Sequence, residues 1–167
     1  ENITPTGRYN VYFKNRWHPL FGDVYGQYVT GFSGHYLFHS VPNEKTVLNA
    51  LETDEFNKLG TNASQGCVRL MVSDAKWIYD NIDMNTSVEV IDKKGTADPL
   101  GKPVTVNIDS QLKWDPTDPA TKNPYNEKMP QITGAEDVTI EKGGKYKPKI
   151  KAIDSCGNDI SDRVKVL

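Results

Sequence analysis

Residues 63–70 read ASQGCVRL, a polar turn that leads into a short apolar run. The turn residues Ser64, Gln65 and Gly66 precede Cys67, one of the two cysteines in the chain. A packing residue is not expected at such a turn, whereas its backbone N–H groups can point at a developing oxyanion. Free cysteines are nevertheless often buried as small apolar residues. The residues alone therefore leave Cys67 open as a core residue, half of a disulfide, a metal ligand or a nucleophile.

Arg69 lies two positions beyond Cys67 and would share its face if the segment is extended. From that position its guanidinium could hold a substrate carboxylate or lower the pKa of the thiol. A surface salt bridge is the ordinary alternative for such an arginine.

A thiol nucleophile needs a base, and the chain offers three histidines. His39 ends the apolar run YLFHS, so we expect its ring at the rim of the core, where packing fixes it and one nitrogen stays accessible. The alternative for His39 is a hydrogen-bonded core residue. His35 would fall on the same strand face and is a second candidate, whereas His18 precedes a proline in NRWHPL and is expected in an exposed loop.

The remaining pattern predicts a mainly β protein with one or two short helices. Segment 8–40 contains short aromatic and β-branched runs broken by Gly, Pro and Asn, which is typical of strands joined by turns. Segment 43–58 favours a short helix or helical loop, and 87–92 a strand. A second helix is predicted over 74–82, capped by Ser73. Its inward face would comprise Ala75, Ile78 and Ile82, with Trp77 beside them.

The composition changes beyond Gly95. Segment 98–130 is rich in proline, which predicts irregular, extended chain. After Pro130 the alternation returns and suggests three or four short strands. An immunoglobulin-type sandwich needs about seven strands and roughly 100 residues, so this tail is too short to be a complete one.

Composition and charge exclude several functional classes. The chain has 167 residues, 20 Lys+Arg and 22 Asp+Glu, for a net charge of −2, and no basic run. Nucleic acid is therefore not an expected partner. No apolar run reaches the roughly 18–20 residues that a membrane span requires. The two cysteines lie 89 residues apart and form no C-x2-C pair that could complete a zinc site with His35 and His39, so a structural metal site is not expected.

Four stretches together resemble the L,D-transpeptidase catalytic domain of the YkuD family: TPTGRY at 4–9, FHS at 38–40, LGTNASQGCVRL at 59–70 and SDAKWIYDNI at 73–82. The resemblance covers roughly residues 3–125 and implies a β-sandwich-like fold for a domain over 1–125 that includes the proline-rich extension. Residues 126–167 resemble the start of a bacterial immunoglobulin-like module, a partial β-sandwich, through DSCGNDIS at 154–161. There Cys156 would occupy a turn without a redox role.

The family resemblance implies a role for each residue of the motif. Cys67 is the expected nucleophile and His39 its general base, with the backbone carbonyl of Ser40 orienting the imidazole. Amides of Gln65, Gly66 and Cys67 would form the oxyanion hole. The other residues expected to shape the site or contact substrate are Arg69, Ser64, His35, Tyr25 and Trp17.

The chemistry implied by the resemblance is acyl transfer between peptidoglycan stem peptides. A Cys67 thioester would form with release of D-Ala from a tetrapeptide donor, and an amine of another stem would resolve it to a 3→3 cross-link. This chemistry needs no metal or organic cofactor, and carbapenem-type β-lactams should acylate Cys67. The alternatives are an L,D-carboxypeptidase or another cell-wall cysteine peptidase, and a non-catalytic surface-binding fragment. The expected location is extracytoplasmic, in the wall or at the surface of a Gram-positive bacterium.

Three features depart from the family pattern. Gln65 stands where many relatives have histidine, so catalysis would rely on His39 alone. The loop between His39 and Cys67 is long, and segment 43–58 is expected to act as a lid. The family domain usually has one or two strands before TPxG, so we expect either a trimmed fragment with an exposed sheet edge or strands supplied by another chain.

Overall fold

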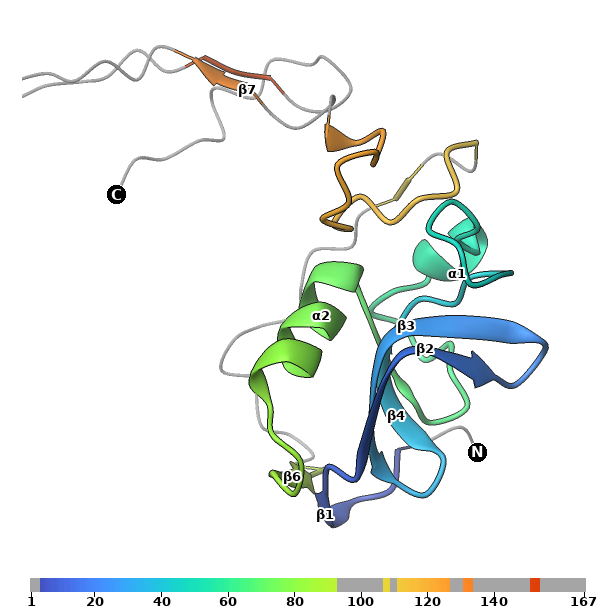
Figure 1. Ribbon diagram of the computed structural model, residues 1–167, viewed down its shortest axis with the longest axis vertical. Helices are drawn as coiled ribbons and strands as arrows, with labels where there is room; N and C mark the ends of the chain where they lie inside the picture. The colour runs from blue at the N-terminus through green and yellow to red at the C-terminus, as the bar shows by residue number, and fades with distance from the viewer. Residues whose placement is uncertain (1–3, 93–106, 109–110, 127–130, 134–150, 154–167) are drawn as a thin grey trace, which may run out of the picture. The chain divides into compact units, whose positions relative to one another are not determined.

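The computed structural model of the protein describes residues 4–92, 107–108, 111–126, 131–133 and 151–153. The chain divides into two compact units, Glu1–Ala120 and Thr121–Leu167, which are considered separately. The first unit contains the residues singled out as a site and is mainly β with two short helices (Figure 1). The predicted fold class is confirmed in this respect.

A four-stranded sheet forms the centre of the first unit. Its strand order is β2-β3-β4-β5, with β2, β3 and β4 antiparallel and β5 parallel to β4. The strands are β2 (Phe13–Leu20), β3 (Val24–Ser33), β4 (Tyr36–Ser40) and β5 (Val68–Leu70). Strands β2 and β3 form a hairpin whose turn has positive φ at Gly22 (92°) and Asp23 (58°). The strands predicted within 8–40 are thus confirmed.

Two further strands pair outside this sheet. β1 (Gly7–Asn10) runs antiparallel to β6 (Ser87–Val90), so the strand predicted at 87–92 is present. His18 lies within β2 and is half-buried, so the expected exposed loop is wrong. The strand continues through Pro19, whose missing N–H is tolerated at the edge of the described sheet.

The helix predicted within 43–58 is confined to α1 (Thr53–Phe56). Upstream of α1, Asn43 forms single bridges with Tyr25 and with Leu51. These backbone pairings hold the chain in an extended path, which overrides the apolar spacing that favoured a helix. Phe56 and Leu51 are nonetheless buried, in a cluster with Val41.

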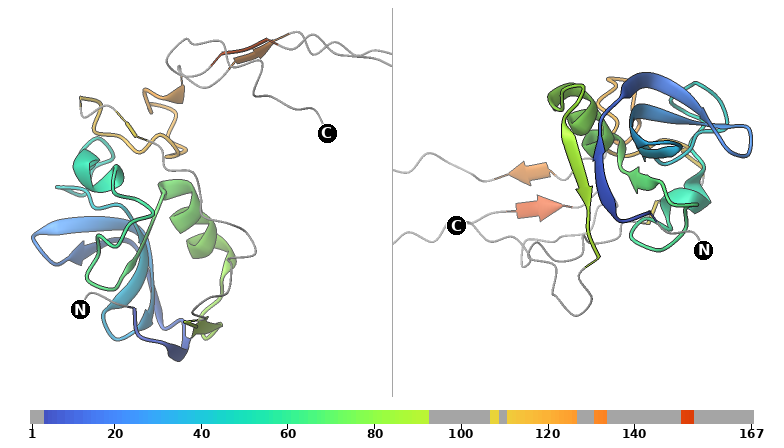
Figure 2. Two further views of the ribbon diagram at one scale, coloured as in Figure 1. Left: turned by 180° about the vertical axis from the view of Figure 1, so that it is seen from behind. Right: turned by 90° about the horizontal axis from the view of Figure 1, so that it is seen from below.

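Helix α2 (Val72–Asn81) begins two residues earlier than predicted and packs beside the sheet (Figures 1 and 2). Ser73 is not its cap; Met71 occupies the N-cap position and makes no side-chain cap bond. The first amides of the helix are instead bound by the proline-rich segment. Val72 N–H donates to Asp115 Oδ2 at 2.9 Å and Ser73 N–H donates to Thr117 Oγ1 at 3.1 Å.

The inward face of α2 also differs from the predicted one. Val72 and Ala75 are fully buried and pack with Tyr28 of β3, and Tyr79 packs against the same cluster. Trp77 is 60% exposed, which corrects its predicted place beside the core.

The described part of the proline-rich segment is irregular, as predicted, and holds the first unit together. Lys113 O accepts from Leu51 N–H, and Asn57 exchanges two hydrogen bonds with the backbone of Ile108. Asp115 is only 1% exposed. The segment is therefore an integral part of this unit.

In the second unit, β7 (Gln131–Thr133) and β8 (Lys151–Ile153) pair antiparallel. Cys156 and the DSCGNDIS stretch lie outside the described residues. The immunoglobulin-like module and the domain boundary near residue 125 stay predictions.

Candidate active site

The parallel pairing of β4 with β5 brings the motif residues together. Its register places His39 opposite Arg69, and Cys67 lies one residue before β5. Residues i and i+2 of an extended chain share a face, so Cys67 and Arg69 lie on the same side as His39. All three line one cavity of about 580 Å³.

His39 is held by its neighbours in a single orientation. It is 2% exposed, and its Nδ1 lies 2.6 Å from the backbone oxygen of Ser40. A carbonyl can only accept, so Nδ1 carries the hydrogen and Nε2 keeps its lone pair. On its other side the ring packs against Gly26, where an added Cβ would lie 3.1 Å from His39 Cβ.

Burial lowers the pKa of His39 to about 4. The hydrogen bond to Ser40 opposes this shift, whereas the positive charges of Arg69 and His18 add to it. At neutral pH the imidazole is therefore uncharged and able to accept a proton.

The side chain of Ser40 fixes the carbonyl that orients this ring. Its hydroxyl accepts from Gln27 N–H at 2.9 Å and donates to Val41 O at 2.8 Å, and all of these groups are buried. The backbone around the accepting carbonyl is therefore tied to strand β3.

Cys67 is half-buried and is a free cysteine in the described part of the chain. Burial raises the pKa of its thiol; a backbone hydrogen bond at Leu37 and the charge of Arg69 only partly offset this. Arg69 thus lowers the pKa of the thiol as expected, but the effect of burial is larger. The Sγ lies 3.4 Å from the carbonyl oxygen of His35, so the resting thiol donates to backbone and not to the His39 ring. The resting pair is a neutral thiol and a neutral imidazole.

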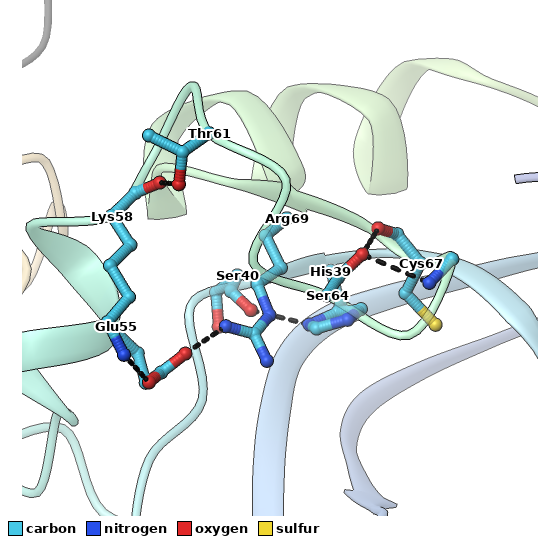
Figure 3. A network of polar contacts seen from close by, with 9 residues as sticks. His39, Ser40, Glu55, Lys58, Thr61, Ser64, Cys67 and Arg69 are labelled. Atoms are coloured by element: carbon cyan, nitrogen blue, oxygen red, sulfur yellow. Dashed lines mark hydrogen bonds and ion pairs between the residues drawn. The ribbon is translucent and has the colours of Figure 1, made fainter. Parts of the chain in front are cut away.

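The turn before Cys67 is held by Ser64 (Figure 3). Ser64 Oγ donates to Cys67 O at 2.7 Å and accepts from Gly66 N–H at 3.1 Å. Gly66 has φ of 107°, a conformation that side chains disfavour. Because the Gly66 amide is already engaged, Gln65 and Cys67 offer the better candidates for oxyanion donors.

Arg69 forms an ion pair with Glu55 of α1, and Lys58 also contacts that carboxylate at 2.6 Å (Figure 3). The side chain of Arg69 is 22% exposed. The salt bridge named as an alternative for Arg69 is thus present, partly buried, and ties α1 to β5, whereas binding of a substrate carboxylate by Arg69 stays a prediction.

The sequence-predicted contact residues separate into two groups. His35, Ser64 and Gln65 line the cavity with Cys67 and His39, whereas Tyr25 and Trp17 do not line it. Another part of the cavity wall comes from the β2–β3 hairpin and was not predicted from the sequence. That wall includes Phe13, His18, Pro19, Leu20 and Phe21.

A second cavity, of about 840 Å³, shares Ser64, Cys67 and Arg69 with the first. Its walls include the N-terminal residues Thr4–Thr6, the loop before the turn, and the end of β6. The cysteine is thus bordered by two concave surfaces.

The described residues hold no cluster of three or more His, Cys, Asp or Glu side chains that could bind a metal ion. Nor does any helix among them have the length and apolar character needed to cross a bilayer.

Cys67, on a glycine turn, thus shares a cavity with a buried histidine whose ring is oriented by a backbone carbonyl, an arrangement in which a thiol and a base could act together. Residues 1–90 match the family model of the L,D-transpeptidase catalytic domain, the YkuD family. Because this match covers more than half of the chain, the protein belongs to that family.

Curated relatives match over shorter stretches. The chain is 51% identical over 57 residues to the putative L,D-transpeptidase YciB of Bacillus subtilis, which covers 34% of this chain and 28% of that protein. It is 42% identical over 45 residues to the probable L,D-transpeptidase ErfK/SrfK of Escherichia coli, covering 26% of this chain and 14% of that protein. The matches thus span under a third of each relative.

Two solved structures are also similar. One is a fused zinc-dependent amidase/peptidase/peptidoglycan-binding protein from Clostridium acetobutylicum, with 34% identity, a TM-score of 0.40 and coverage of 54% of this chain and 35% of that chain. The other is an L,D-transpeptidase from Stackebrandtia nassauensis, with 24% identity, a TM-score of 0.40 and coverage of 56% and 40%.

Proposed function

We propose that the chain is the catalytic part of a peptidoglycan L,D-transpeptidase that forms 3→3 cross-links through a Cys67 thioester. The observation that carries the proposal is the His39–Ser40 arrangement. A buried, neutral imidazole with Nδ1 held on a carbonyl keeps its Nε2 lone pair, and it shares a cavity with the only described thiol.

The resting state defines how the first step would run. With the pKa of the thiol raised and that of His39 lowered, a preformed thiolate–imidazolium pair is disfavoured. Rotation about the Cα–Cβ bond of Cys67 would take Sγ from the His35 carbonyl toward Nε2. The proton then passes to Nε2 as sulfur attacks the acyl carbon of the donor stem peptide, so that charge develops on the substrate oxygen.

The remaining steps return the enzyme to this state. The tetrahedral intermediate collapses to a thioester, and the terminal D-Ala leaves with the proton from His39. An acceptor amine attacks the thioester while His39 removes its proton, and the departing thiolate takes that proton back. Water in place of the amine gives L,D-carboxypeptidase activity. These substrates imply an extracytoplasmic location, at the wall or surface of a Gram-positive bacterium.

Intact mass spectrometry after incubation with a carbapenem tests the proposal. One covalent adduct is expected on the wild type, none on Cys67→Ala, and one on the matched control Cys156→Ala. An unmodified, folded wild type would contradict the proposal and favour a non-catalytic binding module. Iodoacetamide at neutral pH is a poor substitute, because the raised pKa of Cys67 predicts slow alkylation even in an active enzyme.

The reaction products separate the enzyme alternatives. A tetrapeptide donor with an amine acceptor should release D-Ala and give a cross-linked product if the chain is a transpeptidase. D-Ala release without cross-linking would identify a carboxypeptidase, and cleavage elsewhere in the stem would identify another cysteine peptidase.

A further inference from the structure

The N-terminal segment makes a polar contact with the reactive turn that the mechanism above does not use. Thr4 Oγ1 lies 2.6 Å from the backbone oxygen of Gly66, to which it donates across 62 positions of the chain. The bond is partly buried, and Thr4 also lines the larger cavity beside Cys67.

The accepting carbonyl belongs to the peptide plane that carries the Cys67 N–H. In a trans peptide the C=O and N–H of one plane point in opposite directions, and the described chain has no cis bond. A hydroxyl fixed on Gly66 O therefore also fixes the direction of the Cys67 amide. It polarises that amide as well, because hydrogen bonds that share a peptide group strengthen one another.

The following peptide plane is fixed in the same manner. Ser64 Oγ donates to Cys67 O, so each of the two planes that flank the Cα of Cys67 receives a side-chain hydroxyl. Thr4 does this for the plane whose N–H is a candidate oxyanion donor. The need for an external clamp follows from Gly66, whose backbone is the least restricted in the turn.

We propose that Thr4 is a positioning residue that aims the Cys67 amide into the oxyanion hole by holding the carbonyl of Gly66. This inference rests on the proposed acyl transfer, in which negative charge develops on the substrate oxygen. It predicts that Thr4 affects only reactions that form an oxyanion.

Two reactions of the same sulfur separate this role from a structural one. Acylation by imipenem passes through an oxyanion, whereas alkylation by iodoacetamide does not. Loss of one oxyanion donor costs about 10²–10³ in rate. In Thr4→Val the Cys67 amide would be misdirected and not lost, so acylation should slow about 10-fold or more. Alkylation and its pH profile should be unchanged, and Thr4→Ser should restore acylation.

The exposed neighbour Thr6 gives a matched control, since Thr6→Val alters a threonine that lines the same cavity. It should acylate at the wild-type rate. If Thr4→Val acylates within about twofold of wild type, or if both reactions slow together, the positioning role is overturned. If Thr4→Val does not fold, Thr4→Ala replaces it in the same comparison.

A measurement without substrate keeps this test separate from the proposed function. If imipenem does not modify the wild type, the acyl-transfer proposal fails. NMR then tests separately whether Thr4 holds the carbonyl of Gly66 and directs the Cys67 amide. The carbonyl shift of Gly66 and the hydrogen exchange of the Cys67 amide should change in Thr4→Val and return in Thr4→Ser. Unchanged signals in Thr4→Val would overturn the proposed positioning role of Thr4.

Discussion

The reactive strands and the proline-rich segment stabilise the first unit by different means. Several contacts that shape the reactive site are local in sequence: Ser40 is the residue after His39, and Ser64 lies three positions before Cys67, whereas Thr4 and Gly26 contact the site from distant segments. The proline-rich segment acts at long range, since Asp115 binds the Val72 amide across 43 positions. Two of the hydrogen bonds that shape the site are thus encoded locally, whereas the helix that follows the site is begun by residues far along the chain.

The largest effect is expected at the base. His39→Gln cannot accept a proton, and general-base catalysis contributes about 10²–10⁴ in rate. Carbapenem acylation should fall by that factor, whereas His35→Gln, an exposed neighbour on the same cavity, should retain most of it. In the wild type the acylation rate should decline only as the pH falls through about 4, where His39 becomes charged. Loss of activity near pH 6.5 would instead indicate an unshifted imidazole.

Gly26 of β3 tests how strictly packing from the neighbouring strand fixes that base. In Gly26→Ala the new Cβ would lie 3.1 Å from His39 Cβ and 3.3 Å from Nδ1, so the ring must shift by tenths of an ångström. A misplacement of 1 Å can cost about 10²-fold, and we expect about a 10-fold slower acylation. Urea denaturation serves as the control, because a loss of rate in fully folded protein separates displacement of the ring from unfolding.

These two regions also explain which features were predictable. The turn, Cys67 and the strand-end His39 follow from short sequence patterns, as do the strands of 8–40. The start of α2 could not be predicted in this way. Ser73 is a residue type that often caps helices, but the acceptors of the first helical amides are Asp115 and Thr117. No local pattern reports such a long-range bond.

The same limit applies to the cavity walls. Phe13 and His18 line the same cavity as Cys67 because β2 pairs with β3 in one register, which the sequence does not state. The helix expected over 43–58 was reduced to one turn for a similar reason, since Asn43 pairs with Tyr25 of a distant strand.

Asp115 tests the long-range region. Asp115→Ala removes the acceptor of the Val72 amide and of Thr117, so the free energy of unfolding should fall by about 1–3 kcal/mol. The iodoacetamide pH profile of Cys67 should not change, because the helix start is separate from the thiol's own contacts. A parallel change in that profile would mean that the two regions are coupled.

The acidity of Asp115 adds a pH dependence to this test. Burial raises the pKa of its carboxyl, and its hydrogen bonds only partly oppose the shift. A raised folded pKa means a stability contribution that is fully present below the unfolded pKa and is lost as the pH rises through the folded one. The wild type should therefore gain stability relative to Asp115→Asn as the pH is lowered, which urea denaturation in a pH series measures.

The smallest effect is expected at the Arg69–Glu55 pair, which joins the reactive strand β5 to α1. Both side chains are about a quarter exposed, at 22% and 25%, so Glu55→Gln should cost less than about 1 kcal/mol of unfolding free energy. The charge of Arg69 favours the thiolate of Cys67, and removal of the neighbouring carboxylate would leave that charge less compensated. We therefore expect the pH profile of Cys67 alkylation to move to lower pH in Glu55→Gln.

Lys58→Gln is the control for this shift, and it should leave the pH profile of Cys67 alkylation unchanged. Lys58 contacts the other carboxylate oxygen of Glu55 and is absent from the groups that shift the pKa of the thiol. An identical shift in both variants would show that net charge near α1, and not the ion pair, sets the acidity of the sulfur.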